Sequence, residues 1–387
     1  MEKKRIYLDN GSTSFPKAPG VGQAMCSYIE QVGVNVGRGG YETAYSAAQV
    51  VMETREMLCE LFQGPDAKNV IFTNNVTASL NVLLKGYLRP GDHVLTSSME
   101  HNAVMRPLVQ LEKQGVSFDR IPCDGQTGEL CLEKLESMIR PNTKAVVMTH
   151  ASNVCGTLMP IAQVGELCQK HGLTFIVDAA QTAGVFPVRM KDMHIDALAF
   201  TGHKSLLGPQ GIGGFVISDD LAQQVNPLLS GGTGSMSDSE EVPSFLPDRF
   251  EPGTMNLPGV FGLHASLRWL LQDNHMEQVR CHEMALCQRL LEGFHSIPGI
   301  RVVGTDDLNK RGPVVSIDCL DQDNGEISFL LDEQYGVMTR CGLHCAPSAH
   351  KTLGTFPQGT IRFVPGHATT QQEVDEAVQG VRKLVEK

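Results

Sequence analysis

The chain has 387 residues, 41% hydrophobic and 19% charged, as expected for a globular protein with a large core. Its 32 lysines and arginines against 43 aspartates and glutamates give a net charge of −11, which argues against nonspecific binding to nucleic acid or to anionic membranes. The N-terminus lacks the apolar core of a signal peptide, and no apolar run could span a bilayer, so we expect a cytoplasmic protein that acts on small molecules.

The first half of the chain alternates short apolar strands with helices. The expected strands cover 6–9, 70–73, 94–97, 118–122, 145–149, 173–178 and 197–200, and the expected helices cover 44–62, 76–88, 104–113, 132–139 and 162–171. This alternation is typical of a mostly parallel sheet with helices on both faces. The polar, glycine-rich segment 231–241 is expected to be a loop.

The pattern changes near residue 258 to that of a smaller α+β unit. Its expected helices cover 260–271, 276–294, 326–334 and a segment from 371, and its expected strands lie at 300–303, 314–319, 339–340 and 360–364. We therefore predict an α/β protein with a large domain over 18–258 and a small domain formed by 1–17 and 259–387.

The 11 cysteines are an odd number without CxxC spacing, which argues against a disulfide framework and against a zinc site, so no metal is expected. Most of them should be small buried hydrophobic residues. A reactive cysteine therefore has to be identified by its neighbours.

The strand 197–200 ends in Thr201-Gly202-His203-Lys204, which brings a hydroxyl, an imidazole and an amine to one strand end. In open α/β sheets, ligands bind at the carboxyl ends of the strands. An amine there can form a Schiff base with a carbonyl cofactor, and a nearby helix N-terminus can bind the cofactor's phosphate.

Four other strand ends add polar groups to the same edge. The candidates are Asn75, Val76 and Thr77 at a helix start, His101, Asn153, and the pair Asp178 and Gln181. Asp178 could pair with the protonated ring nitrogen of a pyridoxal cofactor, and His101 could stack on a planar ring or move protons. Each residue alone also fits a helix cap, a turn or a surface position, and only their convergence at one edge of the sheet indicates a binding site.

Together these motifs resemble the class V aminotransferase group of pyridoxal-phosphate (PLP) enzymes, in particular its cysteine desulfurase and selenocysteine lyase branch. The resemblance covers nearly the whole chain and implies the PLP-dependent aminotransferase fold type I, in which a large domain with a mostly parallel seven-stranded sheet is followed by a smaller α+β C-terminal domain. The motifs that carry it are 7–9, 99–102, 149–156, 178–181, 201–204, 208–214, 249–256 and 340–345.

The resemblance implies a role for each candidate residue. Lys204 would bind PLP covalently, Asp178 would pair with the ring nitrogen, and His101 would stack on the ring. Gln181 and Asn153 would contact the ring hydroxyl or the substrate carboxylate. The expected phosphate ligands are Asn75 and Val76 through the helix start, Thr77, Thr201, His203, and Thr254 from a second subunit.

The same resemblance implies a substrate site shared across a homodimer. Arg362 matches the arginine that binds the substrate carboxylate, a task that suits the bidentate guanidinium. Arg340 is expected in the same site, and Arg38 is expected near the partner's site.

Cys345 is expected to select the reaction, because it matches the family's sulfur-accepting nucleophile. Its context, between His344 and Ala346, favours it over Cys341. Family members often have two histidines before this cysteine, whereas here Leu343 stands at the first position. Activation of the thiolate is therefore expected from His344 and Arg340.

The resemblance implies a cysteine desulfurase that converts L-cysteine to L-alanine, keeps the sulfur as a persulfide on Cys345, and passes it to an acceptor protein. One alternative is a selenocysteine lyase that acts on L-selenocysteine and delivers selenium. Another is a class V enzyme without sulfur transfer, such as an aminotransferase or an epimerase, and a third is a catalytically silent scaffold. We expect no nucleic acid and no membrane among the partners.

Overall fold

The computed structural model describes residues 5–37 and 39–386, and its centre is a seven-stranded sheet. The strands are β2 (Val70–Thr73), β3 (His93–Ser97), β4 (Ser117–Ile121), β5 (Thr143–Thr149), β6 (Thr174–Asp178), β7 (Ala197–Thr201) and β8 (Gly213–Ile217). Their order is β2-β8-β7-β6-β5-β3-β4, and only β8 runs antiparallel to its neighbours. The predicted mostly parallel seven-stranded sheet is confirmed.

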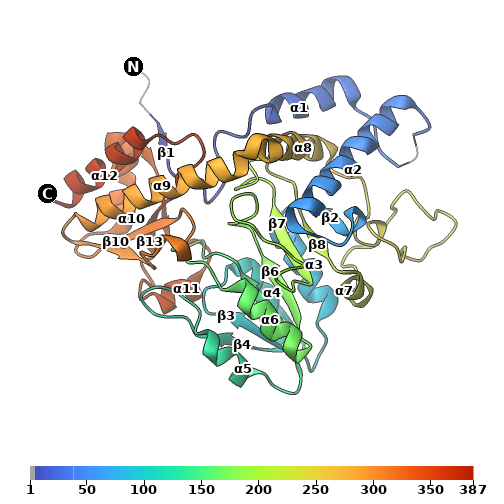
Figure 1. Cartoon of the computed structure of the whole chain (residues 1–387), viewed down its shortest axis with the longest axis horizontal. Helices are drawn as coiled ribbons and strands as arrows, with labels where there is room; N and C mark the ends of the chain where they lie inside the picture. Colours follow the sequence, from blue (N-terminus) through green and yellow to red (C-terminus); the bar gives the residue numbers. More distant parts are fainter. Residues whose placement is uncertain (1–4, 38, 387) are drawn as a thin grey trace.

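Helices cover both faces of this sheet (Figure 1). They are α1 (Val21–Ser27), α2 (Glu42–Phe62), α3 (Val76–Tyr87), α4 (Asn102–Glu112), α5 (Leu135–Met138), α6 (Ile161–His171), α7 (Asp219–Gln224) and α8 (Leu257–Leu271). Helices α3, α4 and α7 pack on one face, and α2, α6 and α8 pack on the other. Successive strand residues point to opposite faces, so each strand contributes to two apolar layers.

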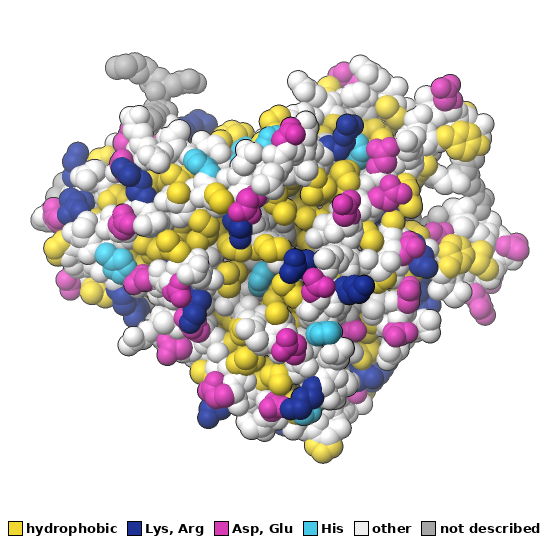
Figure 2. Space-filling model, viewed as in Figure 1, with side chains coloured by type: hydrophobic (Ala, Val, Ile, Leu, Met, Phe, Trp, Pro, Cys, Tyr) yellow, Lys and Arg dark blue, Asp and Glu magenta, His cyan; other side chains and the backbone are white. Residues whose placement is uncertain are grey.

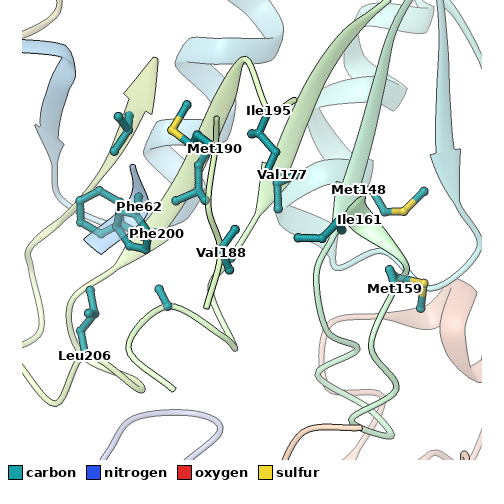
Figure 3. Packing of buried hydrophobic residues seen from close by; sticks show 14 of the residues in the cluster. Phe62, Met148, Met159, Ile161, Val177, Val188, Met190, Ile195, Phe200 and Leu206 are labelled. Atoms are coloured by element: carbon teal, nitrogen blue, oxygen red, sulfur yellow. The ribbon is translucent and has the colours of Figure 1, made fainter. Parts of the chain in front are cut away.

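Figure 3 shows one of these layers. Met148 and Val177 from β5 and β6 lie near Ile161 of α6, and Phe62 at the end of α2 lies close to Phe200 of β7. The rings of Phe62 and Phe200 are 5.6 Å apart. This continuous apolar packing holds the strand ends rigidly in relation to one another.

A second, four-stranded antiparallel sheet lies beside the first, with the order β12-β13-β10-β9. Its strands are β9 (Ile300–Val303), β10 (Val315–Cys319), β12 (Arg340–Gly342) and β13 (Thr360–Phe363), and the helices of this region are α9 (His275–His295), α10 (Asn324–Leu330), α11 (Pro347–Thr352) and α12 (Gln371–Val385). The N-terminal β1 (Ile6–Tyr7) pairs in parallel with β11 (Val337–Met338), so the chain start joins this unit. The unit has its own apolar cluster.

Packing changes between α8 and α9. The buried residues of α8 join the apolar cluster of the large sheet, and α8 lies against α1 and α2. Helix α9 packs on α12 and contributes to the cluster of the four-stranded sheet. The division into 18–258 and 1–17 with 259–387 stays a prediction.

Strand β8 was missed by the sequence analysis, which predicted no strand between residues 200 and 300. A Cβ on Gly214 would lie 2.3 Å from the carbonyl oxygen of Ile71, and a Cβ on Gly213 would lie 2.8 Å from that of Phe200. The two glycines thus allow β8 to fit between β2 and β7, where backbones approach closely. The predicted loop over 231–241 is confirmed, since it contains no helix or strand.

Within the described residues, no helix is long and apolar enough to cross a membrane. Figure 2 shows acidic and basic side chains interspersed over one face, with apolar side chains across its middle. This face therefore offers no continuous basic surface for a polyanion.

Candidate active site

The carboxyl ends of β5, β6 and β7 lie side by side, as predicted for the site. Thr149 is the register partner of Asp178, and Asp178 is the partner of Ala199 on β7. The chain leaves β7 at Thr201 and reaches Lys204 three residues later. The sheet thus brings the predicted lysine and aspartate to the same edge.

Lys204 and Asp178 have the electrostatic properties of a cofactor site. Burial lowers the pKa of the Lys204 amine to about 8, although the Asp178 carboxylate opposes the shift, and Arg362 and Arg340 lower it further. Burial raises the pKa of Asp178, against the hydrogen bond of 2.9 Å that it accepts from the amide of Ala180. A neutral amine can attack an aldehyde, and a protonated pyridine nitrogen would supply the cation that a buried carboxylate needs.

His101 caps α4, because its Nδ1 accepts a hydrogen bond of 3.0 Å from the amide of Ala103. This bond leaves the ring proton on Nε2. Burial lowers the pKa of His101 to about 4, and the charges of Lys204 and Arg362 add to the shift. The ring is therefore neutral at pH 7, which suits stacking and leaves Nε2 as its one donor.

Glu100 is a buried carboxyl at this edge that the sequence analysis did not select. It accepts hydrogen bonds from the hydroxyl of Ser97 at 2.5 Å and from the amide of Thr149 at 3.1 and 3.0 Å, and so ties β3 to β5. Burial raises its pKa to about 8. At pH 7 Glu100 therefore holds a proton and adds no second negative charge beside Asp178. The only available signal was its place before His101.

The candidate phosphate site lies at the start of α3. Asn75 is the N-cap, and its Oδ1 accepts from the amide of Ala78 at 3.0 Å. The side chain of Val76 is buried in the apolar cluster, so only its backbone amide could bind an anion, whereas Thr77 is exposed. Free amides in a first helical turn attract phosphate.

Thr201 Oγ1 and His203 Nδ1, both close to Lys204 in the chain, are among the buried polar atoms that lack a hydrogen-bond partner within the described residues. Burial lowers the pKa of His203 to about 4, so its ring is neutral at pH 7. Unsatisfied buried groups are costly unless a ligand completes them. Both groups suit the phosphate of PLP, and the residues present therefore fit this cofactor.

Thr254 is exposed in the single chain. It lines a pocket of about 250 Å³ together with Asn74 and Ala78, which lie beside the start of α3. The expected contribution of Thr254 from a second subunit stays a prediction. Arg38, also expected near the partner's site, lies outside the described residues.

Asn153 and Gln181 connect the large sheet to distant segments. The Asn153 side chain donates to the backbone carbonyl of His344 at 2.7 Å, and the backbone carbonyl of Asn153 accepts from Arg362 at 2.9 Å. Gln181 donates to the carbonyl of Gly11 at 3.2 Å. Asn153 thus joins the expected carboxylate-binding arginine to the loop that carries Cys345.

Arg362 is buried, and its charge is balanced by a residue near the start of the chain. Its Nη2 donates to Asp9 Oδ1 at 2.9 Å and to Ser12 Oγ at 2.8 Å. Arg340 lies opposite Arg362 in the β12–β13 register, and its Nη1 donates to the same Ser12 hydroxyl at 2.8 Å. Asp9 and Ser12 were missed as site residues, since only the tertiary structure brings them to these arginines.

Cys345 lies in a tight loop with unusual backbone angles. His344 and Cys345 have φ values of 48° and 58°, which L residues rarely adopt. The amide of Asn102 donates to the Cys345 carbonyl at 2.8 Å, and the amide of Ala346 donates to the Leu343 carbonyl at 2.8 Å. The Cys345 side chain is exposed. The loop is thereby held next to the first turn of α4, beside His101.

The expectation that His344 activates this thiol by its charge is wrong. His344 is buried, its Nε2 lies 3.0 Å from Thr360 Oγ1, and burial lowers its pKa to about 2, with Arg362 adding to the shift. Its ring is therefore neutral, and Arg340 is the remaining charged candidate. Cys341 lies within β12, where burial raises the pKa of its thiol.

The chain has the fold of the type I PLP-dependent enzymes, with their strand order and with a lysine and an aspartate at neighbouring strand ends. The sequence model of class V aminotransferases matches residues 6–377, so the chain belongs to this family, whose members use PLP.

Among curated proteins, the chain is 31% identical to a probable cysteine desulfurase of Methanothermobacter thermautotrophicus, over 96% of this chain and 92% of that protein. It is also 31% identical to a probable cysteine desulfurase of Pyrococcus abyssi, over 98% and 94%. Among solved structures, the apo cysteine desulfurase of Thermococcus onnurineus superimposes with a TM-score of 0.92 at 30% identity, over 99% of this chain and 95% of that one. A cysteine desulfurase of Escherichia coli gives a TM-score of 0.88 at 28% identity, over 99% and 95%.

Proposed function

We propose that this protein is a PLP-dependent cysteine desulfurase that converts L-cysteine to L-alanine and keeps the sulfur as a persulfide on Cys345. The observation that carries the proposal is the Cys345 loop, whose carbonyl is bonded to Asn102 and which Asn153 connects to Arg362. A class V enzyme without sulfur transfer has no need for an exposed thiol at this place. The relatives named as cysteine desulfurases support the same activity.

The residues that would hold PLP are Lys204 through its amine, Asp178 at the ring nitrogen, and His101 against the ring. Thr201, His203 and the first turn of α3 would bind its phosphate, joined by Thr254 of a second subunit. Bound PLP supplies an electron-withdrawing ring that stabilises negative charge developing at the amino-acid Cα.

Arg362 would bind the substrate carboxylate, and the released Lys204 amine would take the Cα proton, a task that suits an amine with a pKa of about 8. His101 Nε2 is the donor available for proton transfer near the ring. The Cys345 thiolate then attacks the substrate sulfur, so that the S–S bond forms as the Cβ–S bond breaks. The electron pair of the broken bond stays on Cβ, which gains a proton and becomes the methyl group of alanine.

An acceptor protein would then remove the persulfide sulfur from Cys345, which the exposure of this residue permits. The homodimer with shared active sites and the cytoplasmic location remain part of the proposal and rest on the family resemblance and on the sequence.

The test is to incubate the PLP-loaded protein with L-cysteine and a thiol reductant and to measure alanine and sulfide together. We expect equal amounts of the two products. Borohydride treatment should attach the cofactor to the peptide that contains Lys204, and this label should be absent from Lys204→Ala but present in the exposed control Lys191→Ala. Formation of pyruvate, or alanine without sulfide, would exclude the proposed reaction.

The same assay with L-selenocysteine separates the desulfurase from a selenocysteine lyase. A desulfurase should act on both amino acids and need Cys345 for L-cysteine. A protein that acts only on L-selenocysteine would be the lyase.

A further inference from the structure

The Ser12 hydroxyl uses its full hydrogen-bonding capacity between two arginines and an aspartate. It donates to Asp9 Oδ1 at 2.7 Å and accepts from Arg340 at 2.8 Å and from Arg362 at 2.8 Å. A hydroxyl has one donor and two acceptor lone pairs, so Ser12 can accept no further bond without losing one. Within the described part of the chain, it is the one atom that is hydrogen-bonded to both the exposed Arg340 and the buried Arg362.

The donors of Arg362 are also largely committed. Nη2 has two hydrogens and makes two bonds, to Asp9 and to Ser12, while Nη1 donates to the carbonyl of Asn153. Nε has no partner among the described residues. A guanidinium presents two bidentate edges, Nη1 with Nη2 and Nε with Nη2, and both include Nη2. A carboxylate that binds either edge must therefore displace Asp9 or Ser12.

Ser12 is the weaker of these two partners. Both partners bond to a charged guanidinium, but Asp9 is a carboxylate that also balances the buried cation, whereas Ser12 is a neutral hydroxyl without that Coulombic attraction. Gly11, which lies between Asp9 and Ser12 in the chain, is close to the guanidinium, because a Cβ at this position would be 3.3 Å from Cζ of Arg362. The turn is thus packed against the arginine, with the Ser12 hydroxyl bonded directly to Nη2.

We propose that Ser12 is a positioning residue that couples substrate binding to Arg340. When the substrate carboxylate takes the Nη2 hydrogen of Arg362, Ser12 gives up that bond, and the Ser12–Arg340 contact is released with it. Arg340 then becomes a second free cation beside the bound amino acid, five residues before Cys345. This inference rests on the proposed function in taking an amino acid as the ligand of Arg362.

The test uses the dissociation constant of L-alanine, measured by calorimetry on the PLP-loaded protein, and the KM for L-cysteine. Ser12→Ala removes the group that competes for Nη2 and leaves Asp9 and Asn153 to hold Arg362. We expect both constants to fall about fivefold, the equivalent of the net free energy of about one hydrogen bond, with kcat changed less than twofold. Ser12→Thr keeps the hydroxyl and should keep the wild-type constants. Thr13→Val, which removes a neighbouring hydroxyl that binds the His203 carbonyl instead, is the matched control.

A double-mutant cycle tests the link to Arg340. The effect of Arg340→Ala on L-alanine binding should differ at least threefold between the wild-type and S12A backgrounds, because Arg340 is tied in one and free in the other. Additive effects, or weaker L-alanine binding by S12A, would overturn the proposal. If the wild-type protein binds L-alanine but forms none from L-cysteine, the proposed desulfurase function is wrong and the role of Ser12 in amino-acid binding is not contradicted. If the wild-type protein does not bind L-alanine, both the proposed function and the role of Ser12 are contradicted.

Discussion

The amide of Asn102 donates a hydrogen bond of 2.8 Å to the carbonyl of Cys345, although the two residues are 243 positions apart in the chain. The bond joins the first turn of α4 on the large sheet to the loop after β12 on the small one. It places the candidate nucleophile beside His101, so the histidine proposed to stack on the cofactor ring and the thiol proposed to accept the sulfur are held by the same hydrogen bond.

Cys345→Ser should reduce alanine formation from L-cysteine by at least about 100-fold, because the hydroxyl cannot accept sulfur as a thiolate does. Binding of L-alanine should stay within threefold of wild type, since Arg362 is untouched. The matched control is Cys341→Ser, whose thiol lies within β12. If Cys341→Ser instead causes the larger loss of alanine formation, the assignment of the nucleophile is wrong.

Arg362→Lys should raise the KM for L-cysteine about 10- to 100-fold, because an ammonium cannot make the bidentate contact of a guanidinium. The loss should appear in KM more than in kcat. Arg301→Lys changes a half-buried arginine that is paired with Asp318 on β10 and should have little effect on either constant. A change in KM of less than threefold for Arg362→Lys would show that another residue binds the carboxylate.

Gly213→Ala should weaken PLP binding about tenfold or more, because the new Cβ would lie 2.8 Å from the Phe200 carbonyl and 3.0 Å from Asn75 Cα at the phosphate site. The readout is the PLP concentration that half-restores absorption of the cofactor-free protein. Gly22→Ala in α1, where a Cβ would meet nothing within 4 Å, is the control. Equal affinities of the two variants would show that β8 does not support the phosphate site.

Glu100→Gln should alter how stability depends on pH. Burial raises the pKa of Glu100 from 4.5 to about 8, so between these values the folded state holds a proton that the unfolded state has lost. The free energy of unfolding therefore falls as pH rises through this window, and glutamine, which cannot ionise, removes this fall.

Relative to wild type, the Gln variant of the cofactor-free protein should gain about 2 kcal/mol between pH 6 and pH 8 in urea unfolding. Glu166→Gln on the exposed side of α6 should show no such gain. A constant difference between Glu100→Gln and wild type across this range would mean that Glu100 is already ionised at pH 6.

Much of the candidate site could be predicted locally. Thr201 ends a strand of five buried residues, His203 and Lys204 follow it, and Asp178 ends the strand next to it. Because parallel strands end at one edge, their order along the chain is enough to predict that these groups meet. Strand β8 was not predictable in this way, because its two glycines are loop signals in sequence and are tolerated only where neighbouring backbones leave no room for a side chain.

The sequence by itself determined which chemical groups are present and the strand ends that carry them, because strand periodicity and helix caps are short-range properties of the chain. Only the tertiary structure decided the partners of the two arginines and the charge of the histidines. Ser12 reaches Arg340 and Arg362 across more than 300 residues, and His344 is neutral because it is enclosed against Thr360 rather than because of its neighbours in sequence. Burial and long-range contacts set these properties, and neither can be read from the order of the residues.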